Sequence, residues 1–363
     1  MTTYLIAGGG TAGHVNPMLA IADEIVARHP ESTIIMLGTK EGLESRLIPE
    51  RGYELVTIPK LPFPRRPDAR ALRFLKGYRP AVASIVSLLR DRHVDVVVGV
   101  GGYVSAPAYA AARKAGVPYV IHEANAIPGL ANRLGAKRAA AVAVAFSGTP
   151  LRGAQVVGMP LRQEISTLNI AKARKNARAS FGLRADLPTL VVTGGSQGAR
   201  SINNAIIGAA SALTETGIQI VHITGAGFDG PEITLAGYHR LEYCDRMHDA
   251  LAAADLVVSR AGSSTVSELT ALGIPAIYVP YPVGNGEQVK NARPTIDAGG
   301  GVLVLDADFT ADWARKNIPP LMSDPAQLAT MAAAAASVGH RDASSLMVNL
   351  IDAAVATGQR SAS

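Results

Sequence analysis

The chain has 363 residues, of which 48% are hydrophobic and 18% are charged. This composition is typical of a compact globular protein and excludes a disordered one, and the length favours two domains over one. The apolar runs are shorter than the roughly 20 residues of a membrane-spanning helix, and the single cysteine, Cys244, excludes an internal disulfide or a thiolate metal cluster. The chain starts without a basic leader, so we expect it in the cytoplasm.

Positive charge is concentrated in the first half of the chain. Residues 1–160 hold 19 Lys and Arg against 11 Asp and Glu, whereas the remainder holds 16 against 18. Seven of these cations lie within residues 60–79, mixed with leucine and phenylalanine. Such a segment suits an anionic membrane surface. A solvated helix with inward-facing leucines and a nucleic-acid contact are the alternatives.

Short β-branched runs alternate with longer amphipathic stretches, which predicts an α/β class with parallel sheets covered by helices. In the first half, strands are expected at residues 4–7, 33–37, 55–58, 94–99, 119–121, 141–144 and 155–157. After residue 160 the pattern restarts, with a helix at 171–181 and strands at 190–193, 219–223, 256–259, 276–279 and 302–305. Two helices, at about 325–338 and 343–356, close the chain.

This restart predicts two doubly wound, Rossmann-like domains, residues 1–160 and 161–340, facing each other across a cleft. Ligands of such sheets bind beyond the carboxyl ends of the strands, so the cleft is the expected site. The pattern of the last helix, about 343–357, leaves open whether it packs back on the first domain.

Two strand-to-helix turns are rich in glycine. Residues 8–14 read Gly-Gly-Gly-Thr-Ala-Gly-His, and residues 194–200 read Gly-Gly-Ser-Gln-Gly-Ala-Arg. Glycine lets a backbone approach a ligand closely, and the following helix N-terminus attracts an anion, so both turns are candidate diphosphate sites. The acid that a dinucleotide site needs after the second strand is absent, which disfavours NAD, while Lys40 leaves NADP open.

Polar residues also follow other predicted strands of the first half. His14 opens the first helix and is a candidate general base or anion contact, or a hydrogen-bonded helix-start residue. A third glycine turn spans residues 99–105, and residues 122–133 combine an imidazole, an acid and two amides. Such mixed donors and acceptors suit sugar hydroxyls, although Asn125 or Asn132 could simply cap a helix.

In the second half, a Ser/Thr run at residues 263–265 precedes Glu268. A helix starting there could hold a phosphate and direct Glu268 at a ribose diol, or could be a capping box without a ligand. Asp306 and Asp308 resemble a metal-binding aspartate pair, but their place between a strand and a helix favours turn and capping roles. We therefore expect no metal.

Six motifs in order, beginning with Gly-Gly-Thr-Ala-Gly-His at residue 9 and ending with Glu-Gln-Val-Lys-Asn-Ala at residue 287, resemble the MurG family of peptidoglycan glycosyltransferases. The other four are Gly-Gly-Tyr-Val-Ser, His-Glu-Ala-Asn, Gly-Gly-Ser-Gln-Gly-Ala and Arg-Ala-Gly-Ser-Ser-Thr-Val-Ser-Glu. The resemblance covers essentially the whole chain. Ala12 and Glu287 depart from it, since many relatives have glycine at the first position and some have glutamine at the second.

The resemblance implies the two-domain GT-B fold and an inverting, metal-independent transfer of N-acetylglucosamine. The donor is UDP-N-acetylglucosamine and the acceptor is the 4-hydroxyl of the muramyl sugar of undecaprenyl-linked lipid I, which becomes lipid II. It also implies no cofactor, no nucleic acid, a peripheral place on the cytoplasmic face of the plasma membrane, and cell-wall synthesis proteins as possible partners. A UDP-N-acetylglucosamine 2-epimerase on the same fold and an NADP-dependent oxidoreductase remain as alternatives.

The resemblance also implies roles for single residues. His14 is the leading candidate for the general base, with Glu123 as an alternative or a partner. The matched donor contacts are Thr11, Ala12, Gly13, Asn125, Arg162, Ser196, Cys244, Ser263, Ser264, Thr265, Glu268 and Gln288. The expected acceptor contacts are Tyr103, Ser105 and Asn132. The expected membrane-docking residues are Arg66, Arg70, Arg73, Phe74, Leu75 and Lys76.

Overall fold

The computed structural model describes residues 1–61 and 69–362, and within this range it leaves out the side chains of residues 12, 69–73, 75 and 359–362. The described chain divides into two compact units. Unit 1 comprises Met1–Arg162 and the C-terminal segment from Asp342, and unit 2 comprises Gln163–Arg341.

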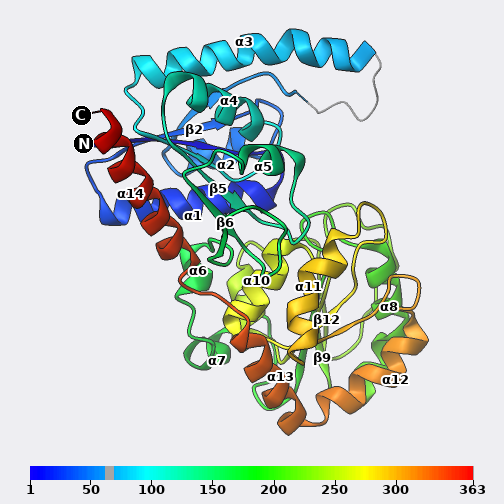
Figure 1. Cartoon of the computed structure of the whole chain (residues 1–363). Coiled ribbons are helices and arrows are strands. Elements are labelled where there is room, and N and C mark those ends of the chain that lie inside the picture. Colours follow the sequence, from blue (N-terminus) through cyan, green and yellow to red (C-terminus); the bar gives the residue numbers. More distant parts are fainter. Residues whose placement is uncertain (62–68, 363) are drawn as a thin grey trace. The chain divides into compact units, whose positions relative to one another are not determined.

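Unit 1 is built on a parallel sheet of seven strands in the order β3-β2-β1-β4-β5-β6-β7 (Figure 1). The strands are β1 (Thr3–Ala7), β2 (Thr33–Gly38), β3 (Glu54–Thr57), β4 (Val96–Gly99), β5 (Tyr119–Glu123), β6 (Ala141–Val144) and β7 (Ala154–Val156). The central strands are buried apolar runs, as expected for a parallel sheet covered on both faces. The order reverses at β1, so the ends of β1 and β4 form the switch point at which such sheets bind ligands.

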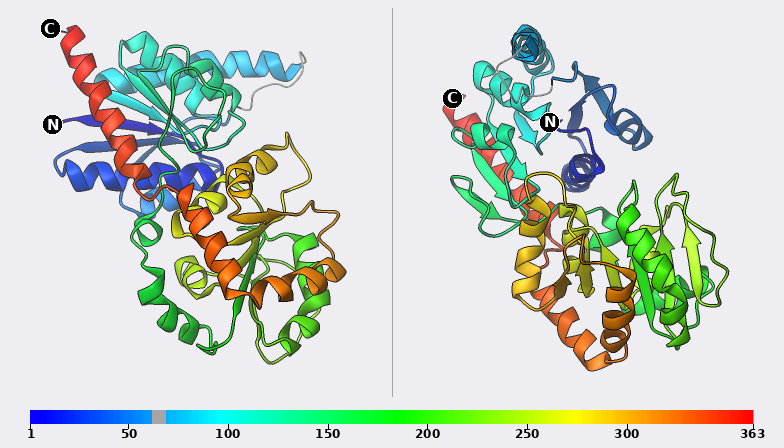
Figure 2. Two further views of the ribbon diagram at one scale, coloured as in Figure 1. Left: turned by 60° about the horizontal axis from the view of Figure 1, so that its bottom comes forward. Right: turned by 90° about the vertical axis from the view of Figure 1, so that its right-hand side faces the viewer.

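Helices of unit 1 cover both faces of this sheet and form two buried apolar clusters. They are α1 (Ala12–Arg28), α2 (Glu44–Glu50), α3 (Ala69–Asp91), α4 (Ser105–Ala115), α5 (Leu130–Gly135) and α14 (Ala343–Ala362). The last helix, α14, packs beside α1 and against β4, β5 and β6 (Figure 2). Arg28 of α1 fastens it by donating to the Ser345 carbonyl at 3.0 Å and to Asn349 Oδ1 at 2.6 Å.

Unit 2 has a parallel sheet of six strands in the order β10-β9-β8-β11-β12-β13. The strands are β8 (Thr189–Thr193), β9 (Gln219–Ile223), β10 (Tyr238–Leu241), β11 (Leu256–Ser259), β12 (Ala276–Tyr278) and β13 (Gly301–Leu303). The sequence-based strands match these except for β10, which was not expected. Its residues, Tyr-His-Arg-Leu, carry little apolar signal because β10 is an edge strand.

The helices of unit 2 are α6 (Gln163–Ser166), α7 (Ile170–Ser180), α8 (Arg200–Glu215), α9 (Met247–Ala253), α10 (Ser263–Leu272), α11 (Glu287–Asp297), α12 (Ala311–Met322) and α13 (Pro325–Ser337). Of these, α8, α12 and α13 form a large apolar cluster with β8, β9 and β11. Among the described residues, no helix combines the length and the apolar character needed to cross a membrane.

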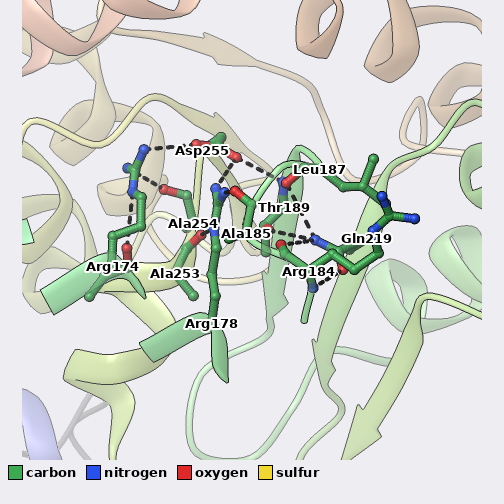
Figure 3. Close-up of polar contacts among 11 residues, drawn as sticks. Arg174, Arg178, Arg184, Ala185, Leu187, Thr189, Gln219, Ala253, Ala254 and Asp255 are labelled. Atoms are coloured by element: carbon green, nitrogen blue, oxygen red, sulfur yellow. Dashed lines mark hydrogen bonds and ion pairs between the residues drawn. The ribbon is translucent and has the colours of Figure 1, made fainter. Parts of the chain in front are cut away.

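A charged cluster fastens α7 to the start of two strands of unit 2 (Figure 3). Asp255, just before β11, accepts from Arg174 at 3.0 Å, from Arg178 at 2.5 Å and from the Thr189 N–H at 2.8 Å. The Arg178 guanidinium also donates to the Ala253 and Ala185 carbonyls. The cluster lies at the amino ends of the strands, away from the edge where ligands bind in α/β sheets, so its role is structural.

Candidate functional site

The first glycine turn leaves the carboxyl end of β1 in unit 1. Gly9 and Gly10 adopt φ values of +142° and +95°, which favour glycine. The Gly8 N–H donates to the Leu37 carbonyl at 3.1 Å, and the Gly10 N–H donates to Glu44 Oε2 at 2.8 Å. The turn is therefore tied to the neighbouring strand β2 and to α2. Sequence reasoning missed Glu44, because nothing near residue 44 indicates a partner 34 residues away.

His14 lies in the first turn of α1 and is half-buried. A methyl group added at Gly101, in the third glycine turn, would lie 3.1 Å from His14 Nε2, so the two turns meet at this imidazole. Within the described part of the chain, His14 Nδ1 is buried without a hydrogen-bond partner. Burial lowers the pKa of His14, against the opposing effects of the Gly9 carbonyl and the Glu44 carboxylate. The imidazole is therefore neutral at pH 7 and able to accept a proton.

The third glycine turn, residues 99–105, joins β4 to α4. The Ser105 hydroxyl is buried, accepts from the Gly101 N–H at 3.1 Å and lies 2.7 Å from the Gly101 carbonyl, to which it donates. It also reaches the Ala7 carbonyl at 3.2 Å. Tyr103, in contrast, is 43% exposed, and the ammonium of Lys60 lies 5.9 Å from its ring centroid. Of these two expected acceptor residues, Tyr103 offers its side chain to solvent and Ser105 does not.

Glu123 ends β5 and is buried beneath the loop that follows. Its carboxylate accepts from the N–H groups of Asn125 and Gly129 and from the Asn132 amide, each at 2.9 Å. Asn132 is only 1% exposed, and its Oδ1 accepts from the Tyr109 hydroxyl at 2.7 Å. Burial raises the pKa of Glu123 more than these hydrogen bonds lower it. The carboxylate thus shapes the loop of residues 124–129.

The second glycine turn leaves the carboxyl end of β8 in unit 2. Neutral groups hold its glycines, and Arg200 at its end pairs with Asp229 at 3.0 Å. The Thr193 hydroxyl accepts from the Gly195 N–H at 3.2 Å. Gly198 has φ of +71°, and a Cβ there would collide with the Thr224 carbonyl oxygen. That carbonyl accepts from Asn203 Nδ2 at 2.8 Å, and the Asn203 Oδ1 lies 3.1 Å from His222 Nε2. Ser196 lies exposed at the tip of the turn.

Helix α10 starts at Ser263, directly after Gly262, whose extended backbone forms the N-cap without a side-chain hydrogen bond. The Ser264 Oγ is a buried atom without a hydrogen-bond partner among the described residues. Buried hydroxyls normally have partners, so this one fits a ligand group. Thr265 and Glu268 are partly buried on the same helix. An unpartnered hydroxyl at a helix N-terminus suits an anion such as a diphosphate.

Gln288, near the start of α11, is oriented by its backbone contacts. Its Oε1 accepts from the N–H groups of Tyr281 at 2.9 Å and of Ala261 at 3.2 Å. This arrangement leaves the amide NH₂ as the group for a ligand hydroxyl.

Arg260, which sequence analysis did not select, lies beside this site. It donates to the Val279 carbonyl at 3.1 Å and pairs with Asp306, which also accepts from Ser201. Asp306 is therefore a partner of Arg260, and no group of three or more His, Cys, Asp or Glu among the described residues is placed to hold a metal.

The other expected donor contacts are divided between the units. Thr11 and Gly13 lie on the first glycine turn, with Ala12 between them as the first residue of α1. Asn125 follows β5, and Arg162 is the last residue of the main segment of unit 1. Cys244 lies between β10 and α9 in unit 2, where burial raises the pKa of its thiol.

The expected membrane-docking segment is described only in part. Arg66 lies outside the described residues, as do the side chains of Arg70, Arg73 and Leu75. Lys76 is exposed on α3, whereas Phe74 packs partly against the core of unit 1.

Two family models match the chain. The glycosyltransferase family 28 N-terminal domain matches residues 4–144, and the glycosyltransferase family 28 C-terminal domain matches residues 189–347. A UDP-N-acetylglucosamine--N-acetylmuramyl-(pentapeptide) pyrophosphoryl-undecaprenol N-acetylglucosamine transferase of Clavibacter michiganensis subsp. michiganensis is 61% identical over 357 residues, which cover 98% of this chain and 97% of that protein.

Solved structures are similar over nearly the full length. The crystal structure of Acinetobacter baumannii MurG has a TM-score of 0.78 and 27% identity, covering 97% of this chain and 99% of that chain. A UDP-GlcNAc 2-epimerase of Neisseria meningitidis has a TM-score of 0.70 at 15% identity, covering 97% and 99% of the two chains, a likeness that shows the fold alone. These likenesses identify the architecture of both units as the GT-B fold.

Proposed function

Because the chain belongs to glycosyltransferase family 28, among UDP-N-acetylglucosamine--N-acetylmuramyl-(pentapeptide) pyrophosphoryl-undecaprenol N-acetylglucosamine transferases, we propose that it catalyses this transfer. N-acetylglucosamine moves from UDP-N-acetylglucosamine to the 4-hydroxyl of the muramyl sugar of lipid I, and lipid II and UDP are the products. The observation that carries the proposal is 61% identity along nearly the whole chain to a relative with that name.

Unit 2 supplies the donor-binding residues in this proposal. Ser264 Oγ, buried without a partner among the described residues, and the N-terminus of α10 hold the diphosphate, and Glu268 contacts the ribose. The NH₂ of Gln288 faces the sugar, because backbone N–H groups occupy its oxygen. Ser196, Ser263 and Thr265 are further donor contacts, and the backbone at Cys244 contacts the uracil.

Unit 1 supplies the base and the acceptor side. An inverting transfer is a single displacement, in which a base takes the acceptor proton as the hydroxyl oxygen attacks the anomeric carbon. UDP leaves with growing negative charge, which the α10 N-terminus stabilises. We assign the base to His14, which is neutral at pH 7. Glu123 already accepts three hydrogen bonds, so it positions the loop of residues 124–129.

The expected acceptor residues also divide into one that contacts the substrate and two that position the surrounding loops. Tyr103 is exposed and contacts the acceptor, whereas Ser105 and Asn132 are buried and hold the surrounding loops in place. Thr11, Gly13 and Asn125 contact the transferred sugar.

The lipid-linked acceptor requires a peripheral place at the cytoplasmic face of the membrane, with the basic residues 60–79 at the anionic surface. Leu130 and Leu134 of α5, 49% and 55% exposed, lie next to the exposed Arg133 and suit the same surface. Binding to vesicles with anionic lipid that weakens with salt, and that weakens further in Leu134→Ser, would support this placement. Binding unaffected by either change would contradict it.

Incubation with labelled UDP-N-acetylglucosamine and a lipid I analogue tests the reaction. The expected result is label in the lipid fraction, produced only when the acceptor is present. A 2-epimerase would instead convert the donor without acceptor, and the sugar recovered after mild acid would be N-acetylmannosamine. Absence of label from the lipid fraction in a folded, vesicle-bound sample would refute the proposed transfer.

A further inference from the structure

Glu44 is the first residue of α2, and its side chain is fully buried, at 0% exposure. Buried carboxylates are usually paired with a cation. Here the hydrogen-bond donors are neutral: the Gly10 N–H at 2.8 Å to Oε2, and the Thr39 N–H at 3.0 Å and hydroxyl at 2.8 Å to Oε1. The carboxylate therefore joins the first glycine turn to the end of β2.

The position of this carboxylate is that of an anion bound to a glycine turn. Backbone N–H groups of a turn after the first strand of a doubly wound sheet are the donors that receive a phosphate in nucleotide-binding domains. A Cβ at Gly9 or at Gly42 would collide with the Glu44 carboxylate. The two glycines therefore leave the space that this carboxylate occupies. The Gly10 donor is thereby occupied by the protein itself.

The carboxylate is ionised at neutral pH. Burial acts to raise the pKa of Glu44, but hydrogen bonds from Gly10, from its own N–H and from Thr39 outweigh burial and lower it. The resulting negative charge also acts on His14, where it raises the pKa against the larger effect of burial. His122 of β5 also interacts electrostatically with His14.

We propose that Glu44 is a built-in anion of the first glycine turn, which occupies the Gly10 N–H and positions the segment that begins the helix of His14. Glu44 is a positioning residue, since it contacts the turn and not the substrate. The inference rests on the proposed transfer. It adds that the two glycine turns, alike in sequence, differ in construction: a carboxylate of the chain holds the first, whereas neutral groups hold the glycines of the second.

The first test compares Glu44→Gln with the wild-type enzyme in the transfer assay. The substitution places an NH₂ group where the N–H donors expect an acceptor, so kcat falls at least tenfold, while the KM for UDP-N-acetylglucosamine changes less than threefold. Loss of the negative charge lowers the pKa of His14, so the acidic limb of the kcat/KM profile and the His14 imidazole NMR titration both move to lower pH. Thr39→Val keeps the charge of Glu44 and removes one hydrogen-bond donor. It gives a smaller fall in kcat, and the acidic limb of the kcat/KM profile stays at its wild-type pH.

The second test is rescue of Glu44→Ala by formate, an anion small enough for the vacated space. Formate restores kcat in this variant, whereas chloride at equal ionic strength does not, and the wild type responds to neither. The proposal is overturned if folded Glu44→Gln keeps wild-type kcat and pH profile, if donor KM rather than kcat changes, or if formate fails to restore kcat. An inactive wild-type enzyme would instead refute the proposed transfer, while the NMR titration would still decide the role of Glu44.

Discussion

The two glycine turns begin alike and are built differently. Each follows the first central strand of its sheet and leads into a long helix, α1 in unit 1 and α8 in unit 2. In the first turn, Gly10 donates to the buried carboxylate of Glu44. In the second, the groups that hold the glycines are neutral, namely the Thr193 hydroxyl and the Thr224 carbonyl, and the charged side chains lie at the start of α8.

This difference shows that a glycine turn by itself does not identify a phosphate site. A carboxylate within the first turn occupies a donor and repels a second anion. The carboxylates near the start of α8, Asp229 and Asp306, are each paired with an arginine, so they compete less for the positive end of this helix. The side chains near each turn, which come from distant parts of the chain, therefore decide which ligand a turn accepts.

The largest expected effect concerns His14, the proposed general base that follows the first glycine turn. In His14→Ala, kcat falls by about 10²–10⁴-fold, the usual contribution of a general base, while donor KM stays within a few fold because we propose that unit 2 binds the UDP part of the donor. Steady-state kinetics at saturating acceptor measure both. His29→Ala, at the other end of the same helix, is the control and keeps wild-type kcat. More than a tenth of wild-type kcat in His14→Ala would assign the base elsewhere.

Alanine at one glycine of each turn sharpens the comparison. A methyl group at Gly198 would combine a positive φ with a collision against the Thr224 carbonyl, so Gly198→Ala lowers the free energy of unfolding by about 3 kcal/mol and raises donor KM. At Gly10, φ is +95° but nothing lies within 4 Å of a Cβ, so Gly10→Ala costs only about 1–2 kcal/mol. Urea unfolding measures both. Equal losses would mean that the Thr224 contact is unimportant.

The sheets and the turns were predictable because their signals are local. Buried parallel strands such as β1 and β8 are continuous apolar runs, and each is followed by glycine, which marks the turn. The edge strand β10 lacked such a run and was missed. The family resemblance supplied the site residues, and for most of them their spacing alone left capping and packing roles open.

Contacts between distant residues could not be predicted from the sequence. Glu44 bonds to Gly10, 34 positions away, and Ser105 to Ala7, 98 positions away. Nothing in the local pattern distinguishes Asn132, which is buried against Glu123, from a residue that faces a ligand. Burial and hydrogen bonding separate supporting residues from those that contact substrate, and both depend on tertiary packing.

His222 tests whether the support of the second turn is neutral. Burial, with Arg240 as a smaller cause, lowers the pKa of His222 to about 3. Below about pH 6.5 the unfolded chain binds a proton that the folded chain does not. The free energy of unfolding therefore decreases as the pH is lowered. Between pH 6.5 and 4.5 this loss is about 2–3 kcal/mol.

Trp313, the one tryptophan of the chain, packs against the core of unit 2 and reports its unfolding by fluorescence. His222→Gln replaces the imidazole with an amide that can still form hydrogen bonds but does not titrate, and it flattens the dependence of stability on pH between 6.5 and 4.5. His122→Gln, a buried histidine of unit 1, leaves the signal of Trp313 with its wild-type slope. A steep slope in His222→Gln would mean that another group of unit 2 carries the acid sensitivity.

The smallest expected effect concerns the proposed diphosphate site at the N-terminus of α10. In Ser264→Ala the donor loses a hydrogen bond to its charged diphosphate, worth about 2 kcal/mol or roughly 30-fold in KM. Ser267→Ala is the matched control, because Ser267 is buried on the same helix, one turn further in, and its loss leaves KM unchanged. The KM for UDP-N-acetylglucosamine and the Kd for UDP should rise together, since both carry the diphosphate. If only kcat fell, Ser264 would stabilise the departing UDP in the transition state without holding the bound donor, and the diphosphate site would have to be assigned to other residues of unit 2.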